Sequence, residues 1–162
     1  MQPESLISLT SARGVDATKA FEVPGTGPVR WTVAEAGMAC QGQSEHVFLA
    51  MLYTYAGDHA AFHYLQWKLT QTAEAMKREE PRQWPKDLAP VKVATLVLME
   101  QREPWKFKRE HPYPDPRRIA LKMPKTTWNR NGCGAYESVH TRYLAWLDAG
   151  RGMMKRWLRN QG

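Results

Sequence analysis

Apolar residues recur at helical spacing in several stretches of this chain, and that periodicity limits the fold more than any other feature. One face of residues 44–56 and one face of residues 59–79 are apolar, which predicts two amphipathic helices. Gly57 ends the first and Asp58 can cap the second, so the pair predicts a helical hairpin with a very short link. Residues 136–147 repeat the spacing and predict a long C-terminal helix. The expected fold class is all-α, a small helical domain.

Two other stretches complete the expected organisation. Residues 1–28 are rich in Ser, Thr, Gly and Pro, which predicts a flexible N-terminal arm, with ordered structure beginning near Trp31 and a short helix over residues 32–41. The apolar run in residues 91–98 permits a helix that starts at Pro90 or a strand; without a second such run, the helix is favoured. We therefore expect three parts: the arm, a helical body over residues 29–101 that could offer a protein-contact surface, and a nucleic-acid-binding region over residues 102–162.

Charge separates the last part from the rest. The net charge of the chain is +7, but residues 1–100 carry −2 and residues 101–162 carry +9. Such a concentration of basic residues in one region is typical of a protein that binds the phosphate backbone of nucleic acid. The alternative is a solvated basic face without a partner. Two cysteines, no secretory leader at Met1 and no long apolar run predict a cytoplasmic protein that does not enter a membrane.

Four prolines within residues 103–116 exclude a regular helix there and predict a basic, aromatic loop. Aromatic and basic residues alternate in it, as Trp105, Lys106, Phe107, Lys108 and Arg109. Such alternation can stack bases and neutralise phosphates. The alternative is that the two aromatic side chains anchor the loop to the core and the cations stay in solvent.

Residues 115–147 have the order of a helix-turn-helix: a short helix, a turn of about four residues, and a second helix that would enter the major groove. In this interpretation Ile119 and Ala120 pack against the second helix. Five cations point outward and hold phosphates: Arg117, Arg118, Lys122, Lys125 and Arg130. Hydroxyls of Thr126 and Thr127 would also contact phosphate, and Asn129 and Arg130 are candidates for reading base edges.

Two features depart from that pattern. Pro124 stands in the turn, where glycine is usual, and Gly132 and Gly134 are expected to break the second helix after a single turn. The alternative to a helix-turn-helix is a proline-rich connector between two core helices.

The segments RRIALKMPKTTWNRN and YESVHTRYLAWLDAG together resemble phage-encoded helix-turn-helix regulators, including late-gene antiterminators of lambdoid phages. The resemblance covers about a quarter of the chain. It implies promoter-proximal binding of double-stranded DNA and contact with RNA polymerase. The matching positions are Ile119, Ala120, Met123, Thr127, Trp128, Arg130, Tyr136, Val139, Leu144, Trp146, Leu147 and Ala149.

Metal and enzyme signatures are weak. His59 and His63 are four residues apart on one helix, but the HExxH and CxxC patterns are missing, so structural histidines are the favoured interpretation. The sequence has no P-loop, dinucleotide-binding glycine pattern or GxSxG motif. The charge and the helix-turn-helix order lead us to expect a DNA-binding transcription regulator, not an enzyme and without a cofactor; the resemblance implies that it is phage-encoded and acts in antitermination. The alternatives are a protein-interaction module or phage inhibitor that docks on a nucleic-acid machine, and third a metal-dependent nuclease.

Overall fold

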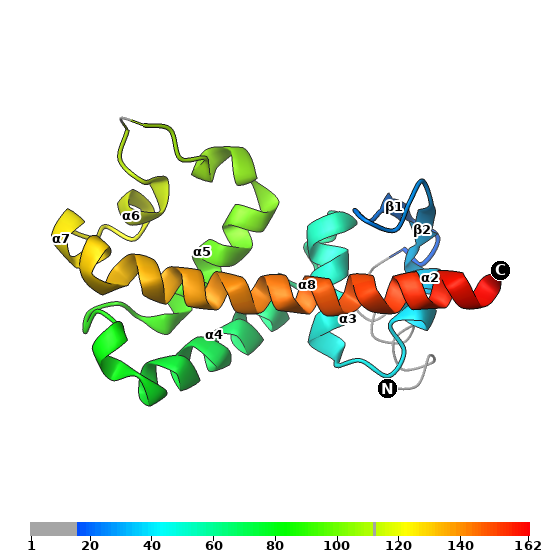
Figure 1. Cartoon of the computed structure of the whole chain (residues 1–162), viewed down its shortest axis with the longest axis horizontal. Helices are drawn as coiled ribbons and strands as arrows, with labels where there is room; N and C mark the ends of the chain where they lie inside the picture. The colour runs from blue at the N-terminus through cyan, green and yellow to red at the C-terminus, as the bar shows by residue number, and fades with distance from the viewer. Residues whose placement is uncertain (1–15, 112) are drawn as a thin grey trace. The chain divides into compact units, whose positions relative to one another are not determined.

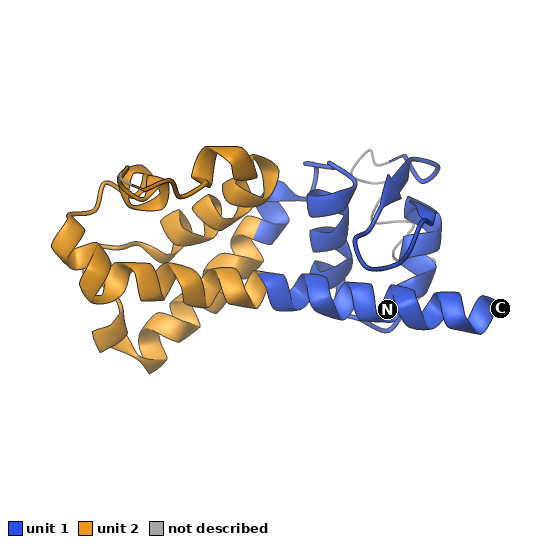
Figure 2. Ribbon diagram, turned by 45° about the horizontal axis from the view of Figure 1, so that its top comes forward, with its two compact units in different colours: residues 1–65, 144–162 blue, residues 66–143 orange. Residues whose placement is uncertain are grey.

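The computed structural model describes residues 16–111 and 113–162, which divide into two compact units (Figure 2). Unit 1 consists of residues 1–65 and 144–162, and unit 2 of residues 66–143. The expected boundaries lie after residues 28 and 101. The observed division instead falls within two helices, because each unit takes part of α4 (Phe62–Glu79) and of α8 (Cys133–Gln161).

Helices make up most of the described chain, and one two-stranded sheet accompanies them (Figure 1). The prediction of a small all-α fold is confirmed. No helix in the described ranges is long and apolar enough to cross a bilayer.

In the described part of unit 1 the first element is a β-hairpin, whose first strand and connection lie in the segment that was expected to be a flexible arm. Strands β1 (Ala20–Glu22) and β2 (Arg30–Thr32) pair antiparallel, with Phe21 opposite Trp31. The connection holds because Thr26 Oγ1 donates to the carbonyl of Val23 at 2.8 Å and accepts from Trp31 Nε1 at 3.2 Å. The Gly- and Pro-rich motif is therefore a hairpin connection, and residues 20–28 are ordered; residues 1–15 of the expected arm lie outside the described residues.

Two helices follow the hairpin in unit 1. Helix α2 (Val33–Ala39) starts with a capping box, in which Thr32 accepts from the amide of Glu35 and the Glu35 carboxylate accepts from the amide of Thr32. Helix α3 (Glu45–Tyr55) is buried along its whole middle, residues 47–53, and Gly57 follows it with a φ of +66°. The helices that were expected to form the hairpin, α3 and α4, are both present and are separated by six residues.

The C-terminal part of α8 completes the core of unit 1. The rings of Trp157 and Trp31 lie 5.5 Å apart, and Trp31 is fully buried. Gly150 packs so closely on α3 that a Cβ at this position would lie 2.6 Å from Cγ of Met51. Glycine here allows close packing of α8 against α3 and leaves α8 unbroken.

Unit 2 contains the rest of α4, a 3-10 turn η1 (Pro81–Gln83), and helix α5 (Pro90–Arg102). The helical interpretation of the apolar run is confirmed, with Pro90 in the first turn as expected. The next elements are a second 3-10 turn η2 (Pro104–Phe107) and the short helix α6 (Pro116–Ala120). A single helical stretch then runs through α7 (Lys125–Thr127), the π-turn η3 (Trp128–Gly132) and α8.

Candidate nucleic-acid interface

Helix α6 buries the opposite face from the one that its sequence suggests. Arg117 is 1% exposed, whereas Ile119 is 54% exposed and Ala120 is also exposed. The predictions that Arg117 points outward and that Ile119 and Ala120 pack against the next helix are therefore wrong. Arg117 is too deeply buried to bind a phosphate.

The buried guanidinium of Arg117 has partners on its edges and on its face. Nε and Nη2 donate to the two carboxylate oxygens of Asp115 at 3.1 and 2.9 Å, and Nη1 donates to Glu137 Oε1 at 2.5 Å. Its Cζ lies 4.8 Å from the ring centre of Tyr136 and 5.4 Å from that of Trp128. A buried cation needs such compensation, and the planar fork of arginine suits two carboxylates and stacked rings. These partners explain why α6 turns Arg117 inward.

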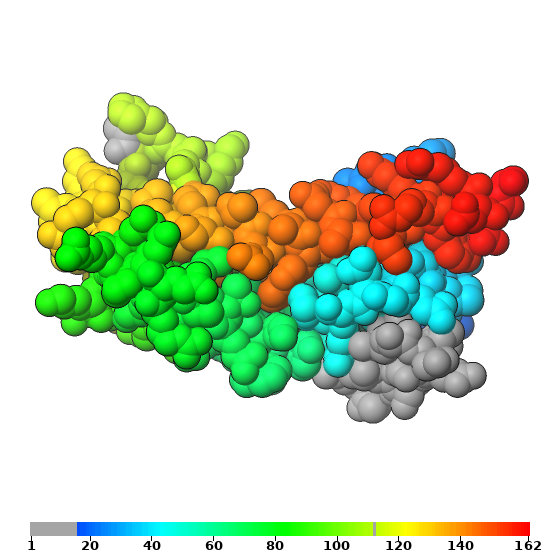
Figure 3. Space-filling view, turned by 60° about the horizontal axis from the view of Figure 1, so that its bottom comes forward, coloured from blue at the N-terminus to red at the C-terminus, as the bar shows by residue number. Residues whose placement is uncertain are grey.

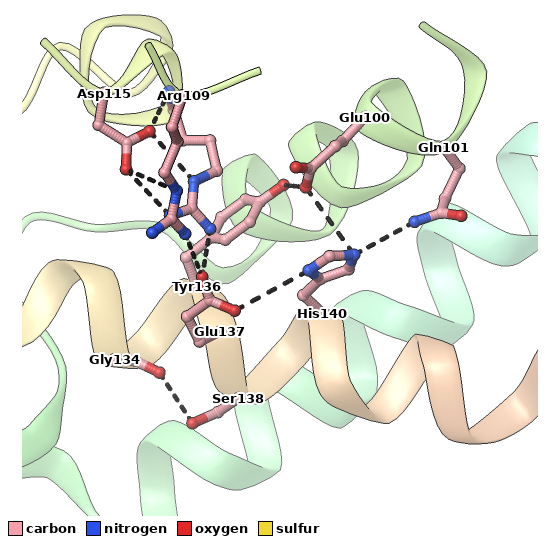
Figure 4. Close-up of polar contacts among 10 residues, drawn as sticks. Glu100, Gln101, Arg109, Asp115, Gly134, Tyr136, Glu137, Ser138 and His140 are labelled. Atoms are coloured by element: carbon pink, nitrogen blue, oxygen red, sulfur yellow. Dashed lines mark hydrogen bonds and ion pairs between the residues drawn. The ribbon is translucent and has the colours of Figure 1, made fainter. Parts of the chain in front are cut away.

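Arg109 brings the preceding loop to the same carboxylates. Its Nη2 donates to Glu137 Oε1 at 2.6 Å, and its Nε lies 3.4 Å from Asp115 Oδ2 (Figure 4). Burial raises the pKa of Asp115, and the charge of Arg109 opposes that shift. The pair Asp115 and Glu137 therefore ties the loop, α6 and the start of α8 together.

A second polar group on α8 ties it to α5. The hydroxyl of Tyr136 donates to Glu100 Oε2 at 2.6 Å, and His140 Nε2 lies 3.2 Å from Nε2 of Gln101 (Figure 4). Burial, together with the hydrogen bond to Glu100, raises the pKa of Tyr136, so the phenol remains a donor. Sequence reasoning did not connect Glu100 and Gln101 with Tyr136 and His140, because the two pairs are more than thirty residues apart in the chain.

The helix after Pro124 is not broken by its glycines. The prediction that Gly132 and Gly134 end it after one turn is wrong, because α7, η3 and α8 form one stretch with helical backbone at Trp128 and Cys133. Gly132 instead gives room to a neighbour: a Cβ there would overlap Sδ of Met123. The π-turn and this close approach together allow Met123, from the turn before α7, to lie against the helix.

A basic groove lies in unit 2 between the connector after α4 and the start of this helix. Its volume is about 1070 Å³, with walls formed by residues 77–92 and residues 121–131. Figure 3 shows the two segments, green and yellow, close to each other within unit 2. Six cationic side chains line the groove with a single carboxylate, that of Asp87. The six are Lys77, Arg82, Lys86, Lys92, Lys122 and Arg130.

Most of these cations are available to a ligand. Lys77 Nζ donates to the backbone carbonyls of Lys86 and Leu88 at 3.5 and 3.3 Å. The other five form no ion pair with any residue in the described ranges. The groove therefore concentrates positive charge that the protein leaves uncompensated.

Besides the buried Arg117, the structure distributes the predicted phosphate- and base-contacting residues over four settings. Lys122, Thr127 and Arg130 line the groove. Lys125, Thr126 and Asn129 are exposed at the start of the same helix without lining it. Arg118 is half-buried and donates to the carbonyl of Met123 at 3.2 Å. Lys106, Lys108 and Arg109 are exposed, but each is within ion-pair distance of a carboxylate: Glu103, Glu110 and Glu137, respectively.

Sequence reasoning missed four of the six groove cations, namely Lys77, Arg82, Lys86 and Lys92, because the first hundred residues are net acidic. The fold divides the charge along different limits from those in the sequence. Unit 2 has 16 Lys and Arg residues against 9 Asp and Glu, a net charge of +7, whereas unit 1 has seven of each. The weak signal in the sequence was the set of cations around Pro81, Pro85 and Pro90.

The aromatic residues of the loop before α6 were expected either to anchor the loop to the core or to be exposed for stacking on bases, and the two residues differ. Phe107 is 9% exposed and anchors the loop, whereas Trp105 is 69% exposed. As for metals, the described parts of the chain contain no group of three or more His, Cys, Asp or Glu side chains placed to hold an ion.

Comparison with protein-family models, with curated proteins and with solved structures gives no match to this chain.

Proposed function

We propose that this chain is a DNA-binding regulator that holds the phosphate backbone of duplex DNA in the basic groove of unit 2. The observation that carries the proposal is the groove itself, with six cations and one carboxylate. Phosphate neutralisation by Lys and Arg supplies most non-specific affinity for DNA, and it needs cations that are not already paired. The side chains of Lys125, Thr126 and Asn129, exposed beside the groove, would then be within the region that approaches the duplex.

The backbone of Lys122 supports a role for its side chain. Lys122 has a φ of +53°, in the left-handed region, where glycine or asparagine is less strained. A residue that holds this conformation despite the strain is a reason to look for function. Its side chain lines the groove, so we assign it to phosphate.

Regulation of transcription, with RNA polymerase as protein partner, rests on the resemblance of residues 117–131 and 136–150 to phage helix-turn-helix regulators. A pull-down of host RNA polymerase with the full chain tests that part separately from DNA binding. Recovery of a different nucleic-acid machine would instead favour the interaction-module or inhibitor alternative.

The test of DNA binding compares two triple variants that lose the same charge. The groove variant loses three cations of the groove through Lys86→Ala, Lys122→Ala and Arg130→Ala. The control variant loses three exposed cations of α8 in unit 1 through Lys155→Ala, Arg156→Ala and Arg159→Ala. Anisotropy of a labelled 20-base-pair duplex is followed from about 50 to 200 mM salt. We expect the groove variant to bind at least about tenfold more weakly and to lower the slope of log K against log salt by about 2 to 3.

The control variant should keep most of the affinity. An equal loss in both variants would show that net charge, and not the groove, governs binding. If the wild-type chain binds no duplex at about 50 mM salt, DNA binding is excluded.

A further inference from the structure

The loop that leads into α6 carries two exposed aromatic side chains that do not line the groove. Among the exposed large apolar side chains of the described residues, the two most exposed are Tyr113, at 73%, and Trp105, at 69%. Both belong to what we name the aromatic loop, residues 104–111 and 113–115. An isolated exposed aromatic residue is ordinary on a protein surface, but two such residues in one short loop indicate a contact surface.

The local structure explains why Trp105 is exposed. It lies in the 3-10 turn η2, where successive side chains are about 120° apart around the axis. Because Phe107 in the same turn is buried, Trp105 and Lys106 are directed elsewhere. The indole is thus held on a formed helical turn whose first position is Pro104.

Further contacts fix the loop on the body of unit 2. Arg109 pairs with Glu137 and Asp115, the carboxylates that also hold Arg117. The backbone amide of Tyr113 donates to the carbonyl of Glu110 at 2.8 Å. A loop that is already ordered loses little conformational entropy when it binds, so its aromatic rings are suited to act as a preformed surface.

The charge around the rings indicates which partner they fit. Residues 102–111 and 113–115 contain four cations, Arg102, Lys106, Lys108 and Arg109, and three carboxylates. Three of these cations form ion pairs on the protein, so the local charge is only weakly positive, but the loop belongs to the unit that carries the whole net charge of the chain. Stacking on aromatic faces with cations nearby is the usual means of binding unpaired nucleic acid, because every base has a π-face. An acidic protein would match the charge but would not require flat, highly exposed rings.

We propose that the aromatic loop binds single-stranded nucleic acid by stacking unpaired bases on Trp105 and Tyr113. This site is separate from the groove and does not depend on duplex binding. A chain with both sites could hold duplex and unpaired strand at once, as at the edge of a melted or transcribed segment.

The experiment measures the anisotropy of a labelled 12-nucleotide oligo(dT), which forms no duplex, with the full chain at about 50 mM salt. Trp105→Ala and Tyr113→Ala should each weaken binding by about 5- to 150-fold, the range found when a stacking residue is truncated. Trp105→Phe keeps a π-face and should stay within about threefold of wild type. Trp67→Ala removes another exposed tryptophan of unit 2, on α4, and should have no effect. Circular dichroism establishes that each variant is folded.

The same variants are then titrated with the 20-base-pair duplex, for which binding should be unchanged within about twofold. Oligo(dT) binding that is undetectable in wild type, or that survives the double change Trp105→Ala and Tyr113→Ala, would overturn the proposal. Equal loss of oligo(dT) and duplex binding would also overturn it, since it would show one shared surface. Failure of the groove proposal gives a different result, an insensitivity of duplex binding to Lys86, Lys122 and Arg130.

Discussion

Arg117 shows how a single charged side chain can decide the orientation of a helix. Asp115, one residue before the first of α6, accepts from the Arg117 amide as an N-cap and from its guanidinium as an ion-pair partner. Glu137 and two aromatic rings complete the enclosure. The exposed position of Ile119 follows, because a five-residue helix cannot bury both faces. Arg117 therefore stabilises the fold and leaves phosphate contact to its neighbours.

Loss of this residue should destabilise the protein. Arg117→Ala would leave the partly buried carboxylates of Asp115 and Glu137 with the exposed Arg109 as their remaining arginine partner, and we expect the free energy of unfolding to fall by about 3 kcal/mol. Ile119→Ala, on the exposed face, should change it by less than about 1 kcal/mol. Urea denaturation followed by circular dichroism measures both. An unchanged unfolding midpoint for Arg117→Ala would contradict the structural role of the cluster.

The two cysteines should differ in reactivity. Cys40 is 1% exposed and burial raises the pKa of its thiol to about 12, whereas Cys133 is half-buried, with a pKa that is also raised, first by burial and then by the charge of Glu137. At pH 8 iodoacetamide should therefore modify Cys133 before Cys40, as peptide mass spectrometry can follow. In the unfolded chain both thiols ionise near pH 8.5, so the contribution of Cys40 to stability is lost as pH rises above that value. Labelling of Cys40 as fast as Cys133 in the native protein would contradict this.

At the scale of elements, sequence patterns identified the helices but not how each is rotated. Apolar spacing predicted α3, α4, α5 and α8, because each buries a broad apolar face. It failed on α6, whose phase depends on Glu137, twenty residues later. It also failed at residues 20–32, where the Gly- and Pro-rich motif joins two strands that are only three residues long. Such short elements carry too few apolar positions for a period to be recognised.

Gly132 and Gly134, near the start of α8, differ in their surroundings, because only Gly132 is closely packed against a neighbour. Gly132→Ala would place a methyl group on Met123, which is 8% exposed, and should destabilise the fold by about 1–3 kcal/mol. Gly134→Ala meets nothing within 4 Å and is exposed, so it should stabilise the helix by up to about 1 kcal/mol. Urea denaturation of the two variants gives the comparison directly. Equal effects of the same sign would show that Met123 does not pack against Gly132.

At the scale of the whole molecule, the basic last 62 residues of the sequence do not coincide with unit 2, the basic unit of the fold. The net charge of +9 in residues 101–162 includes cations of α8 that lie in unit 1, such as Lys155 and Arg159, and it omits the groove cations contributed by residues 77–92. Of the residues predicted to contact nucleic acid, only Lys122, Thr127 and Arg130 line the groove. A count of charges along the sequence does not reveal which distant cations lie close together, because the fold determines this.

This segregation predicts a localised footprint of duplex DNA on the full chain. Amides in the loops that line the groove, around residues 80–88 and 121–124, should exchange hydrogen more slowly when a 20-base-pair duplex is added near saturation. These loop amides exchange by local opening, so their protection reports contact more directly than that of core amides, which also slow when a ligand stabilises the whole fold. The connection between β1 and β2 in unit 1 is the internal reference, because unit 1 has no net charge and its loop amides should keep their rates. Protection confined to unit 1 would contradict the assignment of the groove, and equal protection of loops in both units would show that the duplex does not discriminate between them.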